Sequence, residues 1–596
     1  MRPRCLLAWT IAGLAVVSPA RAEPEDPAVP YRTRFEGPVS DELTTALRDA
    51  SRLVAFRDTP PATRRGLVRR ARNDHGHLRR VLESFGFYDG RVTTRVDTSD
   101  APATVTVTVR PGVVYLMGPV TLDYTGKPPP GLPRHGGAIG LPLGHRARAE
   151  AVLAAEKRLR RKLAEAGYPL AQVGERRAVV HPDRKLLTLT LPVTTGPRAR
   201  FGRARFEGLE TVGKAYVRRL VAWRPGRRFD PDALRRTRRA LLETNLFSGV
   251  TMEPADSLGP HGRLPVTIKV KEGPPRTIGG GVHYDTDKGP ALHARWEHRN
   301  LWGHNETLST RLTLSSPEQR LDVDLRKPLF LAYGQTLRLH GAALSETTEA
   351  FQRRALDAEA GVERVLSDVW TVDAAVAGHV ARLEPLSGET ETSRTSMIAA
   401  LPLTLRADTT ADRLDPGDGE RLTARLAPAA GTFRDGVSYL EARLTGRVYR
   451  TLWSGGVAAA RASVATLTGE PRDNIPQDRR LYAGGAGSVR GYAAQMVGPL
   501  DKNNDPLGGR GLAAVSLELR QRVSGPFGVV PFVEGAKVGA DSTPGSGDTA
   551  MRWGAGLGLR YYTGIGPLRA DVAVPIDRRR NVDDPFQVYV TLGQAF

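Results

Sequence analysis

The run with the clearest chemistry is glycine-rich, LYAGGAGSVRGY, at Leu481–Tyr492. It closes on Val489-Arg490-Gly491-Tyr492, which places one guanidinium group beside a residue that allows close backbone approach. A guanidinium stays charged and binds carboxylates through two parallel hydrogen bonds, so it can hold a long loop inside a cavity. The chemistry of this run is therefore positioning by an ion pair; an exposed loop arginine is the alternative.

Other reactive residue types lack the spacing that catalysis or metal binding needs. The only cysteine is Cys5, and the twelve histidines show no ligand spacing. Gly279-Gly280-Gly281 precedes a strand rather than a helix, which argues against a phosphate loop. Asp501–Asp505 begins like a calcium loop but lacks its glycine and its glutamate, and predicts a turn. We expect no enzyme, no metal and no cofactor.

The N-terminus predicts a signal peptide over residues 1–22. Arg2 and Arg4 precede the apolar stretch Leu6–Val17, and Ala20-Arg21-Ala22 is a small-residue cleavage site. No later stretch reaches the ~18 apolar residues of a membrane helix. An exported chain can still cross a membrane as a closed barrel, whose strands give a weak hydropathy signal.

The formal charge of +22 is concentrated before residue 276, with +3 in residues 1–22, +18 in 23–275 and +1 in 276–596. Export argues against nucleic acid as the partner. Anionic lipid headgroups, lipopolysaccharide phosphates and an acidic protein remain as partners. The alternative is a soluble region whose arginine-rich helices are simply well solvated.

One pattern occurs three times in the basic region: a helical run, a turn, a strand pair and a Gly/Pro stop. The turns contain Gly86, Gly167 and Asn245, 81 and 78 positions apart, and both residue types tolerate the left-handed conformation that ends a helix. Strands with alternating apolar residues follow at Ala103–Val109, Leu186–Leu191 and Leu264–Val270. Each unit predicts a small sheet covered on one face by helices.

These units resemble POTRA domains, with boundaries at 23–111, 112–197 and 198–275. The free edge of a small sheet can capture an extended peptide through its main chain, which suits a module that receives unfolded proteins. The alternative is that the units are only structural spacers.

Residues 276–596 predict a transmembrane antiparallel β-barrel of about 16 strands. Apolar residues alternate with small or polar ones in Ala513–Arg520 and Pro567–Asp577, and the chain ends in an alternating segment at Phe596. A soluble sandwich also alternates, but the export signal and the aromatic C-terminal residue favour the barrel.

Together these features resemble the BamA/TamA-type outer-membrane assembly and translocation barrels of Gram-negative bacteria. Further local matches are Arg299–His304 after the opening strand, and Gly498–Asp501 with Gly508-Gly509 after VRGY. Three repeats match the TamA branch better than BamA, where five are expected, or two-partner exporters, where two are expected.

The resemblance implies that the Val489–Tyr492 loop folds into the barrel lumen and that Arg490 meets acidic groups on the wall. Glu534 is the candidate partner. The family pattern there is Phe-x-Asp-x-Gly, and this chain has Glu534 for the aspartate and Ala536 for the glycine. The charge is kept while the reach changes, so the pairing is a hypothesis.

The resemblance also implies a lateral seam between the first and last strands. Gly279, Gly280 and Gly281 weaken the first strand, because glycine leaves no side chain to pack. Leu592 and Phe596 lie in the segment expected to close the barrel against it. An opened seam offers backbone groups that only another strand can satisfy in lipid.

The expected function is insertion or translocation of β-rich proteins such as autotransporters. The implied partners are a TamB-like periplasm-spanning protein, unfolded outer-membrane protein clients, and outer-membrane lipid and lipopolysaccharide. The expected location is the outer membrane, with the POTRA domains in the periplasm. The alternatives are a two-partner-type exporter that passes one protein through the lumen, and a passive porin or receptor.

Overall fold

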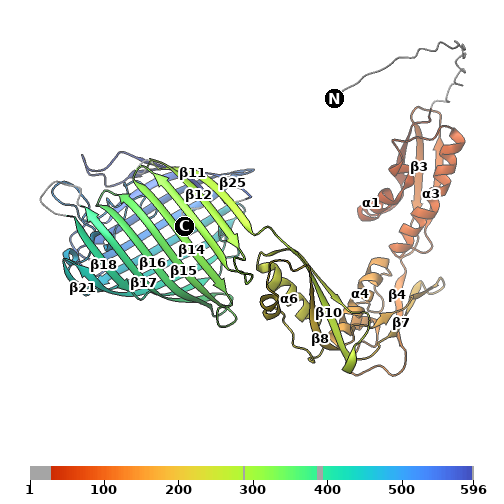
Figure 1. Ribbon diagram of the computed structural model, residues 1–596. Coiled ribbons are helices and arrows are strands. Elements are labelled where there is room, and N and C mark those ends of the chain that lie inside the picture. The colour runs from red at the N-terminus through yellow and green to blue at the C-terminus, as the bar shows by residue number, and fades with distance from the viewer. Residues whose placement is uncertain (1–27, 286–288, 385–392, 565, 593–596) are drawn as a thin grey trace, which may run out of the picture. The chain divides into compact units, whose positions relative to one another are not determined.

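The computed structural model describes all residues except 1–27, 286–288, 385–392, 565 and 593–596, so the signal-peptide prediction and Phe596 lie outside it. Contacts divide the chain into two compact units, whose boundary runs through residues 206–267. No helix in the described ranges combines the length and apolar character needed to cross a bilayer. Figure 1 shows an α/β region followed by a large barrel.

The first α/β sheet has the order β1-β3-β2, with β1 parallel to β3. Apolar residues of α3 at helical spacing, such as Leu67, Leu78 and Leu82, pack with Val105 and Val107 of β3 in one core. The elements are β1 (Tyr31–Glu36), α1 (Asp41–Ala50), α2 (Arg52–Ala55), α3 (Arg64–Ser84), β2 (Arg91–Asp97) and β3 (Ala103–Arg110).

The second sheet has the order β4-β7-β5, with β6 also paired to β7. Its core places Leu159 and Leu163 of α4 with Leu187, Leu189 and Leu191 of β7. The elements are β4 (Leu116–Tyr124), η1 (Gly136–Ile139), α4 (Ala149–Glu165), β5 (Gln172–Val173), β6 (Arg177–His181) and β7 (Leu186–Thr194).

The third sheet has the order β8-β10-β9. Its elements are β8 (Arg200–Glu207), α5 (Lys214–Arg219), α6 (Pro231–Glu243), β9 (Phe247–Pro254), η2 (Pro260–Gly262) and β10 (Arg263–Glu272). The predicted helix stops have left-handed backbone in all three units, with φ of 82° at Gly86, 93° at Gly167 and 57° at Asn245. These turn predictions are confirmed.

A closed antiparallel barrel begins at Arg276. Its strands are β11 (Arg276–Asp285), β12 (Gly289–Arg299), β13 (Thr307–Ser315), β14 (Glu318–Pro328), β15 (Gln335–Thr347), β16 (Gln352–Val365), β17 (Trp370–Glu384), β18 (Arg394–Ala400), β19 (Leu403–Asp408), β20 (Gly419–Phe433), β21 (Asp435–Trp453), β22 (Gly456–Thr468), β23 (Gly511–Ser524), β24 (Phe527–Gly539), β25 (Arg552–Thr563), β26 (Gly566–Pro575) and β27 (Gln587–Leu592). β18 and β19 both pair with β17 and β20, so together they occupy the position of one barrel strand. Counted in this way, the described barrel has sixteen strands, which confirms the predicted antiparallel barrel of about 16 strands.

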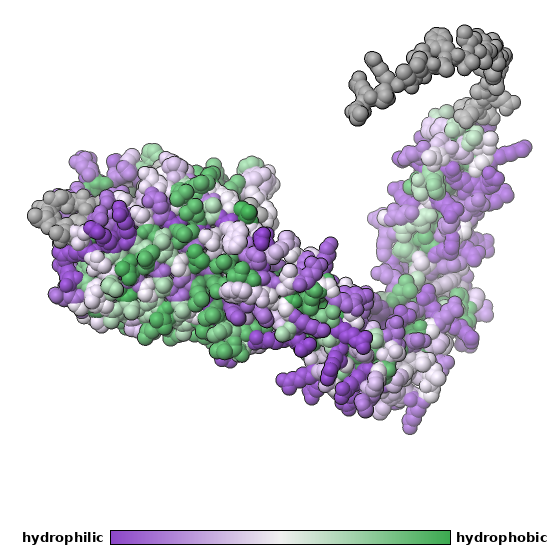
Figure 2. Space-filling view, viewed as in Figure 1, coloured by the Kyte–Doolittle hydropathy of each residue, from purple (hydrophilic) through white to green (hydrophobic). Residues whose placement is uncertain are grey.

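The strands alternate between a lipid-facing and a lumenal side, as predicted. Leu517, Val572 and Val574 are about half exposed on the outside, while Glu518 and Asp571 are buried. Figure 2 shows apolar residues spread over the barrel surface, whereas hydrophilic residues dominate the α/β region. This pattern is that of a barrel surrounded by lipid.

Candidate functional site: a loop held in the barrel lumen

The segment between β22 and β23, residues 469–510, packs inside the barrel. Leu481, Val489 and Tyr492 of this lumenal loop share one buried cluster with wall residues from several strands. The wall residues include Ile398 of β18, Ala429 of β20, Tyr439 of β21, and Ala536 and Val538 of β24. The loop is therefore seated by apolar contacts on more than one side of the lumen.

Arg490 holds the middle of this loop through three carboxylates. Its Nε and Nη2 donate to the two oxygens of Glu534 at 3.0 and 2.7 Å, and its backbone N–H donates to Oε2 at 2.7 Å. Nη2 also donates to Glu518 and Nη1 to Asp571, each at 2.7 Å. The ring of Phe532 lies 3.4 Å from the guanidinium carbon. The structure thus brings together Arg490 and Glu534, and adds Glu518 and Asp571, which the sequence analysis did not propose as partners of Arg490.

The three acids come from strands whose alternation points them inward. Arg520 pairs with Glu518, and Arg560 and Arg569 pair with Asp571. This Arg490 cluster (Arg490, Arg520, Arg560, Arg569, Glu518, Glu534 and Asp571) is buried throughout. A buried charge is stable only when opposite charges pair with it, so the removal of one member of the cluster leaves the charges of its partners buried and unpaired.

The residues on either side of Arg490 fit the loop closely to the wall. Gly491 has φ 119°, and a Cβ there would lie 2.8 Å from the carbonyl oxygen of Val574. Val489 is fully buried, and the Tyr492 hydroxyl donates to the Trp553 carbonyl at 3.3 Å. A side chain at position 491 would therefore displace the loop from β26.

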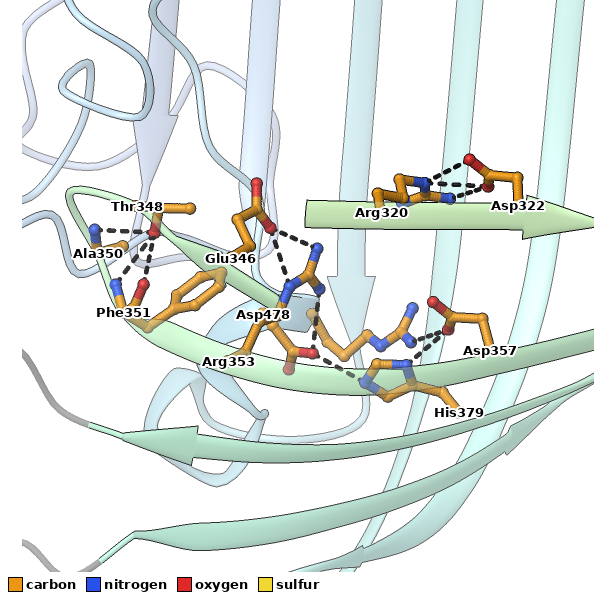
Figure 3. Close-up of polar contacts among 11 residues, drawn as sticks. Arg320, Asp322, Glu346, Thr348, Ala350, Phe351, Arg353, Asp357, His379 and Asp478 are labelled. Atoms are coloured by element: carbon orange, nitrogen blue, oxygen red, sulfur yellow. Dashed lines mark hydrogen bonds and ion pairs between the residues drawn. The ribbon is translucent and has the colours of Figure 1, made fainter. Parts of the chain in front are cut away.

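A second anchor holds the loop through Asp478. Asp478 accepts from Nε2 of His379 at 2.8 Å and from Nη1 of Arg353 at 3.3 Å, as Figure 3 shows. Nδ1 of His379 lies 2.7 Å from Asp357, which Arg479 of the loop also contacts at 3.3 Å. Both ring nitrogens therefore face carboxylates, and both donate only when the imidazole is protonated. Arg353 additionally pairs with Glu346 at 2.8 Å, and these six residues form the Asp478 cluster.

Sequence reasoning did not identify the Asp478 cluster or the additional acids at Arg490. The available signal was strand alternation, since Glu518, Asp571, Asp357 and His379 occupy inward positions of alternating strands. Strand alternation predicts which side of the barrel wall a residue faces, but it does not predict which wall residues a distant loop contacts.

The first and last strands of the barrel meet at a seam, which the structure describes at two register positions. β11 pairs with β27 at Tyr284–Val590 and Asp285–Tyr589, whereas it pairs with β12 at ten positions. Gly279, Gly280 and Gly281 pair with β12. The predicted role of these glycines at the seam also involves residues 593–596, which lie outside the described part of the chain. Leu592 pairs with Leu568 of β26.

The third α/β region carries a basic pocket of about 930 Å³. Its floor includes the stacked rings of Phe201 and Trp223, with centroids 4.9 Å apart. The charged residues that line it are Arg200, Arg224, Arg227, Arg228, Asp230 and Arg236. Five arginines and one aspartate give this pocket a net positive charge.

Comparisons with known proteins match two parts of the chain. The Omp85 superfamily domain matches residues 300–596, and the POTRA family, described as a surface antigen variable number repeat, matches residues 199–273. The outer membrane protein assembly factor BamA of Nitratidesulfovibrio vulgaris is 22% identical over 437 residues, 70% of this chain and 54% of that relative. The chain thus spans about half the length of this curated relative.

Among solved structures, BamA from Haemophilus ducreyi lacking POTRA domains 1–3 covers 80% of this chain and 99% of its own, with a TM-score of 0.68 and 18% identity. CdiB from Acinetobacter baumannii covers 80% of this chain and 90% of its own, with a TM-score of 0.45 and 14% identity. The first likeness establishes the shared barrel fold.

Proposed function

We propose that this protein assembles outer-membrane proteins. The proposal is supported by the match of residues 300–596 to the Omp85 superfamily domain and by the POTRA match that precedes it in the chain. In this proposal it inserts or translocates β-rich clients such as autotransporters. The α/β region receives unfolded chains at free sheet edges, and the barrel passes them sideways into lipid. The task is binding and guiding, and it requires no catalytic group.

The observation that carries the proposal is the filled lumen. The lumenal loop is tied by the Arg490 and Asp478 clusters, which obstructs a path through the barrel. In the described part of the chain, β11 and β27 meet at Tyr284–Val590 and Asp285–Tyr589. In lipid, backbone groups released at this seam can be satisfied only by another strand, and a client strand supplies them.

We place the protein in the TamA branch on the basis of its three α/β repeats, and we propose a TamB-like periplasm-spanning partner. The arginine-lined pocket of the third α/β region is the proposed docking surface for an acidic segment of that partner. Arginine forks bind carboxylates through paired hydrogen bonds, and the aromatic floor offers apolar contact beside them.

Quantitative proteomics of the outer-membrane and secreted fractions tests this function. The strains compared are one depleted of the protein, one with Arg490→Ala and a control with Arg472→Ala. Arg472 belongs to the same loop, and its ion-pair partner Asp473 is 66% exposed. A joint decrease of several barrel proteins in the depleted and Arg490→Ala strains supports assembly. Loss of a single secreted protein from an unchanged membrane would identify an exporter instead.

A further inference from the structure

A hollow on the lipid-facing side of the barrel combines a row of polar residues with a row of apolar ones. The hollow has a volume of about 580 Å³ and spans β13 to β18. Along one edge of the hollow, five residues of neighbouring strands lie side by side in register and form the polar row: Gln319, Ser345, Arg354, Arg382 and Thr395. Two positions away from this row in every strand, on the side toward the membrane interior, lies the apolar row: Leu321, Ala343, Leu356, Val380 and Met397.

Both rows face the lipid. Leu356 is 63% exposed and Val380 41% exposed, whereas the residues beside them, Asp357 and His379, lie inside with the lumenal loop. Arg354 follows Arg353, which points inward to Asp478, so strand alternation turns Arg354 outward. Ala343 is the smallest member of the apolar row, and its position between two leucines accounts for the hollow.

The polar row lies at the extracellular end of the strands. β11 starts directly after the periplasmic region, and successive strands alternate in direction, so the turn between β15 and β16 is extracellular. Arg354 is the third residue of β16 and Arg382 the third from the end of β17. This level corresponds to the headgroups of the outer leaflet, and the apolar row below it corresponds to acyl chains.

The two arginines are directly opposite each other in register. Like charges in this arrangement repel across ~5 Å. Arg382 has Glu384 at 3.6 Å, with both side chains well exposed, and no carboxylate of the described residues is within ion-pair distance of Arg354. A single anion between the guanidinium groups would relieve the repulsion through paired hydrogen bonds.

We propose that this hollow binds a phosphorylated acyl lipid of the outer leaflet. The phosphate lies between Arg354 and Arg382, with Ser345 and Thr395 as flanking donors, and acyl chains cover Leu321, Leu356 and Val380. The charge pair selects the phosphate, and the hollow beneath selects the chain. This inference depends on the membrane placement of the barrel and is independent of the assembly role.

The test titrates the purified full chain, in neutral detergent, with diphosphorylated lipid A and with the same lipid after enzymatic dephosphorylation. Wild type is compared with an Arg354→Gln/Arg382→Gln variant. Arg364→Gln is the matched control, because Arg364 lies on the same face of β16 at its periplasmic end. We expect the double variant to bind the phosphorylated lipid about tenfold or more weakly, as expected for lost charge-assisted hydrogen bonds, and the control to match wild type.

Two further arms make the result decisive. Ala343→Phe fills the hollow and is expected to weaken lipid binding while both arginines remain. Inorganic phosphate at millimolar concentration is expected not to displace the lipid, and full displacement would show that the phosphate group alone is the ligand. Equal binding of both lipid forms by wild type, or unchanged binding by the double variant, would overturn the proposal.

Discussion

Arg490→Ala is expected to release the lumenal loop. The substitution removes four side-chain hydrogen bonds to three buried carboxylates, while the backbone bond to Glu534 remains possible. Breaking a buried ion pair by removing one partner costs about 3–5 kcal/mol. If the docked state of the loop is destabilised by this amount, the equilibrium between the docked and the released loop shifts toward release by about 10²- to 10⁴-fold.

Limited chymotrypsin digestion measures this shift at Tyr492, which is only 1% exposed when the loop is docked. Cleavage of a transiently open segment follows the population of the open form when closing is fast. We expect cleavage at Tyr492 to accelerate by at least about 100-fold in Arg490→Ala. Arg472→Ala is the control, because its partner Asp473 is 66% exposed and an ion pair open to solvent is worth about 1 kcal/mol or less. Equal cleavage of the two variants would show that the Arg490 cluster does not hold the loop in place.

Three other predictions follow from named contacts. Asp478→Asn removes the carboxylate shared by His379 and Arg353, so chymotrypsin cleavage at Tyr482 should rise more than tenfold, and an unchanged rate would contradict a second anchor. Gly280→Val should slow hydrogen exchange in β11, because valine raises strand propensity by about 1 kcal/mol and its Cβ meets only ordinary contact; faster exchange would contradict this. The pKa of Asp89 is lowered, first by its hydrogen bond from Lys185 and then by Tyr115. The stability it contributes should therefore be present above about pH 4 and lost as pH falls through the lowered pKa, so that Asp89→Asn and wild type converge in acid; a constant difference in unfolding midpoint would contradict it.

Local sequence rules predicted the features that neighbouring residues determine. The turns at Gly86, Gly167 and Asn245 adopt the positive φ that their residue types allow. The alternation in β23 and β26 assigned Glu518 and Asp571 to the side opposite the leucines and valines, and the structure buries both acids in the lumen. In each case the residues that determine the feature lie within a few positions of it in the sequence.

The remaining features depend on pairings between distant segments. Sequence reasoning missed the opening strand of each α/β unit (β1, β4 and β8), because these strands acquire their role by pairing with the last long strand of the unit, as β1 does with β3. It also missed the approach of Asp478 to His379, which are 99 residues apart. Such contacts depend on where the loop enters the lumen, and no local pattern encodes that position.

The proposed function requires that clients pass through the seam and not through the lumen. Site-specific photo-crosslinking during client assembly tests it directly, with one probe at Val282 of β11, which is 82% exposed, and one at Ala377 on the lumenal wall of β17. We expect adducts between a nascent barrel protein and the Val282 probe, and none at the Ala377 probe. Adducts at Ala377 without any at Val282 would contradict the seam route and establish transport through the lumen.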